Sequence, residues 1–531
     1  MIAASPLKYR TAVQSLLRSR PRLLFWAGLL TIVLFGLALA GVSAGRSLRI
    51  DEPLTANMMA EPLFQMLAER IRTSIRPVYF MLARLWTGLF GESEIALRSI
   101  SMLFFGLTIV TVGVTARRIA GMPAGLIAAL LVATSTGMGL IQAATARPYA
   151  LLGLEAALAV LLWVQLVPLP LLTGESHPRA RPLWQTAGLV ALLILLNIVG
   201  LLTHTIFAFF VAAYIGVTIL VSWRWFVLLS VGGAVSLGTF LLLRGPILFG
   251  VMEGPSLDWM PVPDLGDLKT AFDSLWGTRK TLIVLAYAAG LVLVRFRQSL
   301  GVLWSRAFLT SAGILVLTSL MPFVFSQYKV VFNPERIPIM FLPPAALALA
   351  IFLGRVGWRP LTLLVMALVA LGSVNTAVRT YGEVTQPAAR ESVQYVVEQA
   401  QCGDTLVLGG LSYAEVTYYL RRFDAPGCLQ IETFPQDTAS HPGWMDVVGL
   451  LDRRDDLVTE AQSTVARLAD QPEGQVWLFY NSADGPVTTT YGAEVTEVFK
   501  AEIDQALALE QELNFRGSYF NHILVYTPRT R

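Results

Sequence analysis

The sequence predicts an α-helical polytopic membrane protein with about eleven transmembrane helices, followed by a soluble α/β domain. Of its 531 residues, 55% are hydrophobic and 14% are charged, and the mean hydropathy is +0.60. Soluble domains carry about a quarter charged residues. The charges also divide unevenly, because residues 1–377 hold 29 Lys/Arg and 14 Asp/Glu, whereas residues 378–531 hold 11 and 22. We therefore predict a membrane domain over 1–377 and an acidic soluble domain over 378–531.

Apolar runs of spanning length place the transmembrane helices. The first run, 23–44, follows three arginines and lacks a convincing cleavage site, so we interpret it as a span rather than a signal peptide. Ten further runs lie at 95–115, 123–142, 148–167, 184–201, 204–222, 226–249, 281–296, 307–325, 337–354 and 360–377. The runs at 184–201 and 204–222 could instead form one hairpin with short arms.

The distribution of arginines predicts the orientation. With the N-terminus in the cytoplasm, the basic loops around 117–118, 179–181, 224, 295–306 and 355–359 all fall on the cytoplasmic side. The odd number of spans then places the C-terminal domain outside, in the periplasm of a bacterial inner membrane. The basic residues are scattered between apolar runs, so nucleic acid is not an expected partner.

The first outer loop, 45–94, is long and amphipathic. Apolar residues recur at helical spacing in PLFQMLAERI and in VYFMLARLWTGLF, and each stretch is too short to span. We expect interfacial helices that lie along the membrane. The alternative is one more, poorly marked span across 77–115.

The C-terminal domain reads as strands alternating with helices. DTLVLGG, QVWLFYN and FNHILVYT predict strands, and ARESVQYVVEQA, AEVTYYLRRF and LVTEAQSTVARLA predict helices, which together favour a small, partly parallel sheet. Cys402 and Cys428 each precede a predicted strand. In an oxidising compartment a disulfide is plausible, although two buried free thiols are the alternative.

A pair of carboxylates follows the first span. Asp51 and Glu52 stand in SLRIDEP at the expected membrane surface. One could act as general base on an acceptor hydroxyl, with the other orienting it or helping to hold a metal ion. A solvated loop also tolerates such a pair.

Further polar residues open or interrupt the later runs. Arg147 and Tyr149, in ATARPYALL, begin the fourth span; Arg147 could bind a phosphate or could extend to the interface. His204, in GLLTHTIF, could contact a ligand or simply pack. Glu155 lies within the fourth span and needs a partner, for which Arg147, two turns away, is the candidate.

The last outer loop, in SQYKVVFNPERIPIMFLPP, contains Lys329 and Arg336. These two cations could bind a phosphate headgroup, or they could belong to the loop surface. Their placement favours a site, because the orientation derived from Lys/Arg bias alone puts Asp51, Arg147, His204 and Arg336 on the same outer face.

Taken in order along the chain, the motifs of this sequence resemble those of the GT-C glycosyltransferases of the protein O-mannosyltransferase and aminoarabinose-transferase type. The most specific segment, 77–121, is similar to that family's P-x-Y-x-x-L-x-x-x-W-x-x-x-F-G-x-S-E-x-A-x-R pattern. SLRIDEP precedes this segment. After it come ATARPYALL, GLLTHTIF, SLDWMPVPDLGDLKTAFDSLWG and PERIPIMFLPPAALALA. The resemblance covers about 50–360.

The resemblance implies a GT-C fold and an inverting transfer of a sugar from a polyprenyl-phosphate carrier to an envelope glycan, lipid or protein. Carried over, Asp51 is the catalytic base, with Glu52 beside it. The carrier phosphate or substrate would be bound by Arg76, Tyr79, Arg147, Tyr149, His204, Lys329 and Arg336. A divalent cation, Mg²⁺ or Mn²⁺, could bind at Asp51.

Two departures from the family pattern leave the metal and the sugar open. Many relatives read Gln-Glu-Ala-Arg where this chain reads Ala144-Thr145-Ala146-Arg147, so a second acidic residue is missing. Arg76 stands where relatives often have His or Pro. The alternative functions are a transporter or flippase for lipid-linked glycans, for which an internal repeat would be typical, and an assembly protein whose C-terminal domain binds partners.

Overall fold

The computed structural model describes residues 21–49, 51–67, 77–168, 172, 182–253, 261–382, 388–439, 447–471, 474–482 and 492–529. The chain forms two compact units. The first consists of Met1–Ala44, Leu67–Leu82 and Arg98–Ala377, and the second of Gly45–Met66, Ala83–Leu97 and Val378–Arg531. The second unit therefore combines the C-terminal residues with two pieces of the first outer loop. Each unit is described by itself below.

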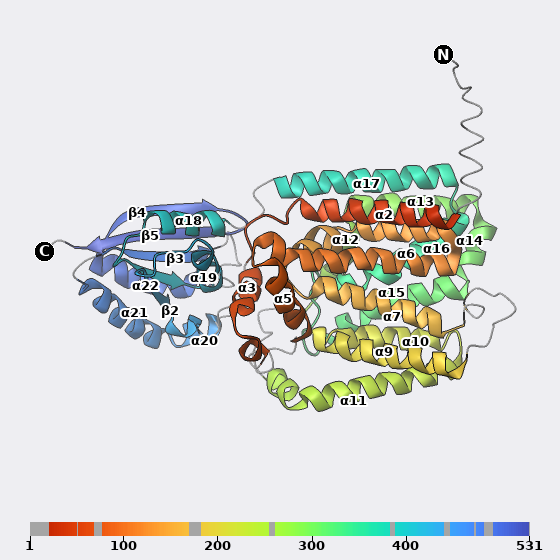
Figure 1. The fold of residues 1–531 in the computed structure, drawn as a ribbon, viewed down its shortest axis with the longest axis horizontal. Coiled ribbons are helices and arrows are strands. Elements are labelled where there is room, and N and C mark those ends of the chain that lie inside the picture. The colour runs from red at the N-terminus through yellow and green to blue at the C-terminus, as the bar shows by residue number, and fades with distance from the viewer. Residues whose placement is uncertain are drawn as a thin grey trace, which may run out of the picture. The chain divides into compact units, whose positions relative to one another are not determined.

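The first unit is a bundle of apolar helices, which confirms the membrane-protein fold (Figure 1). Within the described ranges, seven helices are long and apolar enough to cross a membrane, or eight if one bent pair counts as a span. The seven are α2 (Pro21–Gly41), α6 (Glu94–Ala133), α7 (Tyr149–Leu166), α9 (Leu183–Thr203), α11 (Trp223–Glu253), α15 (Arg306–Phe325) and α17 (Arg359–Gly382). Two shorter apolar helices, α10 (Phe207–Thr218) and α16 (Leu342–Val356), complete the bundle.

The predicted pair of runs at 95–115 and 123–142 is realised by α6, which turns back on itself. The turn lies at Ala120 and Gly121, and Gly121 has φ +84° and ψ −179°, a conformation that side-chain-bearing residues rarely adopt. The two arms pack closely, since a Cβ on Gly125 would lie 2.9 Å from the carbonyl oxygen of Gly113. The sequence thus correctly predicted two apolar segments here.

The bent pair comprises α12 (Leu265–Trp276) and α13 (Thr278–Val294), which meet at 84°. Gly277 joins them with φ +80°. A capping box between Asp264 and Asp267 begins α12. A short helix, α14 (Phe296–Leu303), follows α13.

Burial identifies the centre of the bundle. In the apolar window of α7, 83% of the residues are buried, compared with 22% in α11. The outer helices expose leucines such as Leu34, Leu195 and Leu363, as lipid-facing helices do. Because α7 is central, residues at its N-terminal end are well placed to meet several other segments.

The second unit contains a five-stranded sheet of order β2-β1-β3-β5-β4. Its strands are β1 (Thr405–Gly409), β2 (Gln430–Phe434), β3 (Val476–Ser482), β4 (Leu507–Arg516) and β5 (Phe520–Pro528). β1 is parallel to β2 and β3, whereas β5 is antiparallel to β3 and β4, so the predicted partly parallel sheet is confirmed.

Helices cover both faces of this sheet, which explains why every residue of β1 is buried. On one face lie α21 (Arg454–Ala469) and α22 (Ala493–Ala506), packed on Val407, Leu478 and Leu524. The other helices that contact the sheet are α18 (Ala389–Gln399) and α19 (Tyr413–Arg422). A short helix, α20 (Val447–Asp452), contacts α21 and α22.

The described residues of the predicted first outer loop are largely helical; that these helices lie along the membrane stays a prediction. α3 (Asp51–Ala60) and α5 (Pro77–Phe90) are its main helices, and residues 63–67 are also helical. The chain breaks at Gly91, with φ +81°, before α6 begins. That break excludes the alternative of one continuous span across 77–115. The predicted runs at 184–201 and 204–222 correspond to two helices, α9 and α10, with residues 204–206 between them.

Candidate active site

Four segments of the helical unit meet at one end of the bundle: 134–149, 203–206, 264–280 and 326–342. The π-helix η1 (Thr136–Ile141) contacts α12 and the 3-10 helix η3 (Ile337–Met340), which in turn contacts α7. Two of the basic residues assigned to the cytoplasmic side, Arg355 and Arg295, lie at the opposite helix ends. Arg355 donates to the carbonyl of Ile119 (3.3 Å) and Arg295 to that of Val356 (2.9 Å). This separation is what the predicted topology requires; the orientation in a membrane stays a prediction.

Three predicted site residues come together at this end from distant parts of the chain. Tyr149 is buried at the first position of α7, after Pro148. The centroid of its ring lies 6.1 Å from the centroid of the His204 ring. The guanidinium carbon of Arg336 lies 5.6 Å from the same Tyr149 centroid. A guanidinium at this distance from an aromatic face forms a cation–π contact. The cluster of Tyr149, His204 and Arg336 is the core of the candidate site.

The break between α9 and α10 places His204. It is the C-terminal cap of α9 in an extended conformation, with its side chain 8% exposed. Its Nδ1 accepts a hydrogen bond from the backbone N–H of Ile206 (3.3 Å). The neutral ring therefore carries its proton on Nε2, so that nitrogen would be the donor toward a ligand.

Irregular helix precedes Tyr149 and carries Arg147. The π-helix η1 is followed by η2 (Gln142–Ala144), a 3-10 turn. π-helical turns are frequent at functional sites. Thr145 fixes the next turn, because its hydroxyl bonds the carbonyl of Ile141 (2.7 Å) and its carbonyl accepts from the N–H of Arg147 (2.9 Å). Arg147 is partly buried two residues before Tyr149.

The loop after α15 delivers Arg336. The hydroxyl of Ser326 accepts from the N–H groups of Val331 and Phe332 (2.9 and 2.8 Å), which closes the first part of the loop. The side chain of Asn333 accepts from the N–H of Arg336 (3.2 Å), which fixes the turn before η3. Lys329 starts the same loop at the end of α15 and is partly exposed.

A buried carboxylate lies behind His204. Glu155, 2% exposed on α7, accepts a hydrogen bond from the hydroxyl of Thr203 (2.7 Å), the residue before His204. The expectation that Arg147 would be the partner of Glu155 was wrong, because the end of α9 brings Thr203 to this carboxylate. The bond connects α7 to the turn that carries His204.

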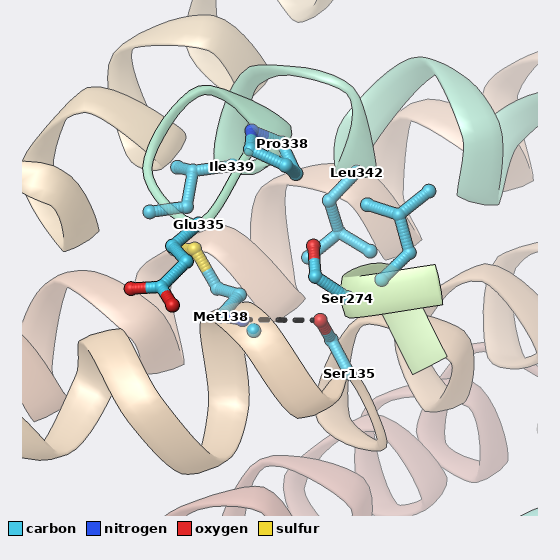
Figure 2. Close-up of a pocket in the computed structure, with 9 residues that line it drawn as sticks. Ser135, Met138, Ser274, Glu335, Pro338, Ile339 and Leu342 are labelled. Atoms are coloured by element: carbon cyan, nitrogen blue, oxygen red, sulfur yellow. Dashed lines mark hydrogen bonds between the residues drawn. The ribbon is translucent and has the colours of Figure 1, made fainter. Parts of the chain in front are cut away.

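A small pocket lies among three of the four segments that meet at this end of the bundle (Figure 2). Its lining residues come from η1, α12, η3 and the start of α16, and from the residues just before η1 and η3. Gly137 permits the close packing, since a Cβ there would lie 2.9 Å from the carbonyl oxygen of Ser274. Figure 2 shows the hydrogen bond from the N–H of Met138 to the hydroxyl of Ser135, and Glu335 at the rim. The pocket is lined by Ser135, Gly137, Met138, Ser274, Leu275, Glu335, Pro338, Ile339 and Leu342.

Sequence reasoning missed a buried lysine near this pocket. Lys280, 5% exposed on α13, donates to the carbonyl of Thr134 (3.3 Å) and to the hydroxyls of Thr136 (3.1 Å) and Ser373 (2.9 Å). These neutral acceptors join α13 to the end of α6, to η1 and to α17. Only the motif TRKTL marks it in the sequence, where it looks like an ordinary interfacial cation.

Asp51 and Glu52 belong to the second compact unit and occupy the first turn of α3. Glu52 is fully buried and its carboxylate accepts from the backbone N–H of Arg49 (2.9 Å). Asp51 is partly exposed. The structure thus distinguishes the two carboxylates, giving Glu52 a structural bond across the turn. The sharing of one site by Asp51, Arg147 and Arg336 stays a prediction.

The remaining predicted residues are placed as follows. Tyr79 is buried on α5 with its ring edge-on to Phe80 (5.7 Å), and its part in the site stays a prediction. Arg76 lies outside the described residues. Cys402 and Cys428 form a disulfide.

The described part of the chain contains no group of three or more His, Cys, Asp or Glu side chains that could hold a metal ion. The carboxylate of Glu52 accepts a hydrogen bond from the backbone N–H of Arg49. A divalent cation at Asp51 stays a prediction, and no chemical step is assigned to it.

No protein-family model and no curated protein matches the sequence. Solved structures do match. ArnT from Cupriavidus metallidurans in the apo state aligns over 95% of this chain and 97% of its own, with a TM-score of 0.61 and 13% identity. The same protein bound to undecaprenyl phosphate gives a TM-score of 0.60 at the same identity and coverage.

The chain therefore has the fold of the GT-C glycosyltransferases, as the sequence predicted. It is similar in fold to ArnT, an aminoarabinose transferase, over nearly its whole length. At 13% identity this likeness establishes the architecture, and the chemistry has to be argued from the residues.

Proposed function

We propose that the protein is an inverting glycosyltransferase that moves a sugar from a polyprenyl-phosphate carrier to a cell-envelope acceptor at the periplasmic face of a bacterial inner membrane. The observation that carries the proposal is the cluster of Tyr149, His204 and Arg336 at one end of the bundle, with Arg147 two residues from Tyr149. The fold supports it, because ArnT has been crystallised bound to undecaprenyl phosphate.

The cationic residues suit a lipid phosphate as leaving group. In the transfer, the acceptor hydroxyl attacks the anomeric carbon, and the bond from that carbon to the phosphate oxygen breaks on the opposite side. Negative charge then develops on the departing phosphate. Arg147 and Arg336 would balance this charge, and contacts that strengthen as it develops lower the barrier. His204 Nε2 and Tyr149 could donate further hydrogen bonds to the phosphate or sugar.

Asp51 is the proposed general base. A carboxylate within about 3 Å of the acceptor hydroxyl would take its proton as the new glycosidic bond forms. Asp51 lies in the first turn of α3. Glu52 would hold the turn through Arg49 rather than react.

The test is transfer by the purified full-length protein with polyprenyl-phosphate-linked sugars, followed by mass spectrometry of envelope acceptors. We expect Asp51→Asn to lower turnover by about 100-fold or more while carrier binding is retained, because the base is lost with little change in volume. If Asp51→Asn and the wild type transfer equally, the catalytic assignment is wrong. A flippase would move the carrier across vesicles without cleaving it.

A further inference from the structure

The segment that carries Asp51 is held by two helices of the C-terminal domain. Residues 45–66, 83–97 and 378–531 belong to one compact unit, and within it α3 packs against α19. The contacts lie on both sides of Asp51 along the chain. This arrangement gives the C-terminal domain a role that the sequence did not suggest.

The first anchor is made by Tyr419 of α19, just before Asp51. Tyr419 is fully buried, and its hydroxyl accepts a hydrogen bond from the backbone N–H of Leu48 (2.9 Å). The same hydroxyl lies 3.3 Å from that of Ser47 and 3.4 Å from the carboxylate of Glu94. A single phenol thus fixes the backbone three residues before Asp51.

Arg390 of α18 reinforces this anchor. Its guanidinium donates twice to Glu94 (2.6 and 2.9 Å) and once to the carbonyl of Gly45 (2.7 Å), while its backbone N–H donates to Ser47 (3.1 Å). Glu94 is the first residue of α6. Arg390 is half-buried, where charge-assisted hydrogen bonds are stronger than on an open surface.

The second anchor lies after Asp51, at Asn57 of α3. Its amide donates to the carbonyl of Ala414 (2.8 Å) and to the hydroxyl of Thr417 (2.9 Å), and its carbonyl accepts from Arg421 (3.2 Å). All three partners belong to α19. Between the two anchors, the bond from the N–H of Arg49 to Glu52 closes the turn.

We propose that α18 and α19 form a clamp that positions Asp51, with Tyr419, Arg390 and Asn57 as positioning residues. The inference rests on the proposed role of Asp51 as base. A general base acts only within hydrogen-bond reach of the acceptor hydroxyl, and a displacement of about 1 Å can lower the rate about 100-fold. The C-terminal domain would therefore contribute to catalysis through the geometry of this segment, without touching the reacting atoms.

The experiment compares Tyr419→Phe, Arg390→Ala and Asn57→Ala with a matched control, Arg467→Ala, in the full-length protein in nanodiscs. Arg467, on α21, pairs with Glu432 of β2 in the same domain. Hydrogen exchange of residues 45–60 reports the clamp directly. We expect faster exchange in all three variants and not in the control.

Turnover tests the catalytic consequence. The three variants should lower kcat by about 10- to 100-fold and leave the KM for the lipid-linked donor unchanged. Arg390→Lys should recover part of the activity that Arg390→Ala loses, because lysine keeps the charge beside Glu94 but not the planar donor set. In an Asp51→Asn background they should cause no further loss, because a missing base cannot be misplaced. A purely structural defect would add to the loss and also raise the KM.

The outcomes separate the two proposals. Unchanged exchange over 45–60 overturns the clamp whatever the activity. Faster exchange with an unchanged kcat overturns its catalytic role. If wild-type protein transfers no sugar from any lipid carrier, the proposed function fails, and the clamp is then a structural feature that the exchange data alone establish or refute.

Discussion

The guanidinium of Arg336 lies against the ring of Tyr149, and this contact defines what the residue can do. Stacking on an aromatic face orients the planar guanidinium without neutralising its charge. The backbone N–H of Arg336 donates a hydrogen bond to the side-chain oxygen of Asn333, which fixes the turn from which the Arg336 side chain extends.

We predict that Arg336→Ala weakens binding of polyprenyl phosphate by about 10- to 100-fold, the loss expected for one or two hydrogen bonds to a charged group. Arg336→Lys should restore only part of the affinity, because lysine lacks the planar donor set. Binding can be followed by intrinsic tryptophan fluorescence. Arg359→Ala, an exposed arginine at the start of α17, is the control. Equal affinities in all variants would contradict a phosphate-binding role.

A second residue-scale prediction concerns Glu415 on α19. Burial raises the pKa of its carboxyl from 4.5 to about 7, although hydrogen bonds from Tyr519 and Asn481 favour the ionised form. The pKa of Glu415 is higher in the folded state than in the unfolded state. The contribution of this carboxyl to the free energy of unfolding is therefore fully present below pH 4.5 and is lost as the pH rises through about 7. The difference amounts to about 3 kcal/mol.

Thermal unfolding of the full-length protein between pH 4.5 and 8 checks this expectation. Wild type should lose stability over that range, and Glu415→Gln should flatten the profile. The control is Glu398→Gln, an exposed carboxylate on α18, which should keep the wild-type profile. A wild-type midpoint that rises steadily to pH 8 would contradict the prediction.

At the scale of elements, the turn inside α6 depends on one glycine. Gly121 combines φ +84° with ψ −179°, so a side chain there is strained. We predict that Gly121→Ala destabilises the helical unit by about 1–3 kcal/mol. Gly290→Ala, within α13 where nothing lies within 4 Å of the new Cβ, should be neutral or stabilising. Unfolding in detergent measures both, and equal midpoints would refute the argument.

The strands that could be predicted from the sequence are those buried on both faces, because such burial requires a continuous run of apolar residues. β1, β3 and β5 are central strands, covered on both sides, and their apolar runs identified them. β2 and β4 lie at the edges of the sheet. QIETF and LALEQELNFR have largely exposed faces and therefore lack a continuous apolar run. For this reason β4 was not predicted, and β2 was expected only as the strand that follows Cys428.

The site followed the same logic. Lys/Arg bias predicted that His204 and Arg336 share one face. The number of spans between two loops decides whether they lie on the same side of the membrane, and no tertiary contact has to be known. It could not identify the partner of Glu155, since Thr203 reaches that carboxylate only when α9 ends beside α7. Arg390 and Tyr419 escaped too, because their partners lie about 300 or more positions away in the sequence.

At the scale of the molecule, the disulfide joins the segments before β1 and β2, the two parallel strands at one side of the sheet. It closes a loop of about 27 residues, which is worth roughly 3 kcal/mol in the chain-entropy model. We predict that Cys402→Ser destabilises the C-terminal domain by about this amount.

The same bond tests the orientation of the chain. In protein taken from native membranes, a maleimide should label neither cysteine until a reductant is added, because disulfides persist on the oxidising side. Cys402→Ser leaves Cys428 as a labelled control. Two reactive thiols in the wild type would argue against the periplasmic placement of this domain.

The second unit is assembled from segments that are far apart in the sequence, so its parts are synthesised at different times. Residues 45–66 and 83–97 leave the ribosome roughly 300 positions before residues 390–421, which supply their partners. At about 5–20 residues per second, that gap is about 15–60 s. During this interval Glu94 lacks Arg390, and Asn57 lacks the helix that binds it. A ribosome that stops before residue 390 would therefore release a chain with a complete helical bundle and an unclamped Asp51, so quality-control proteases would meet an inserted but inactive protein.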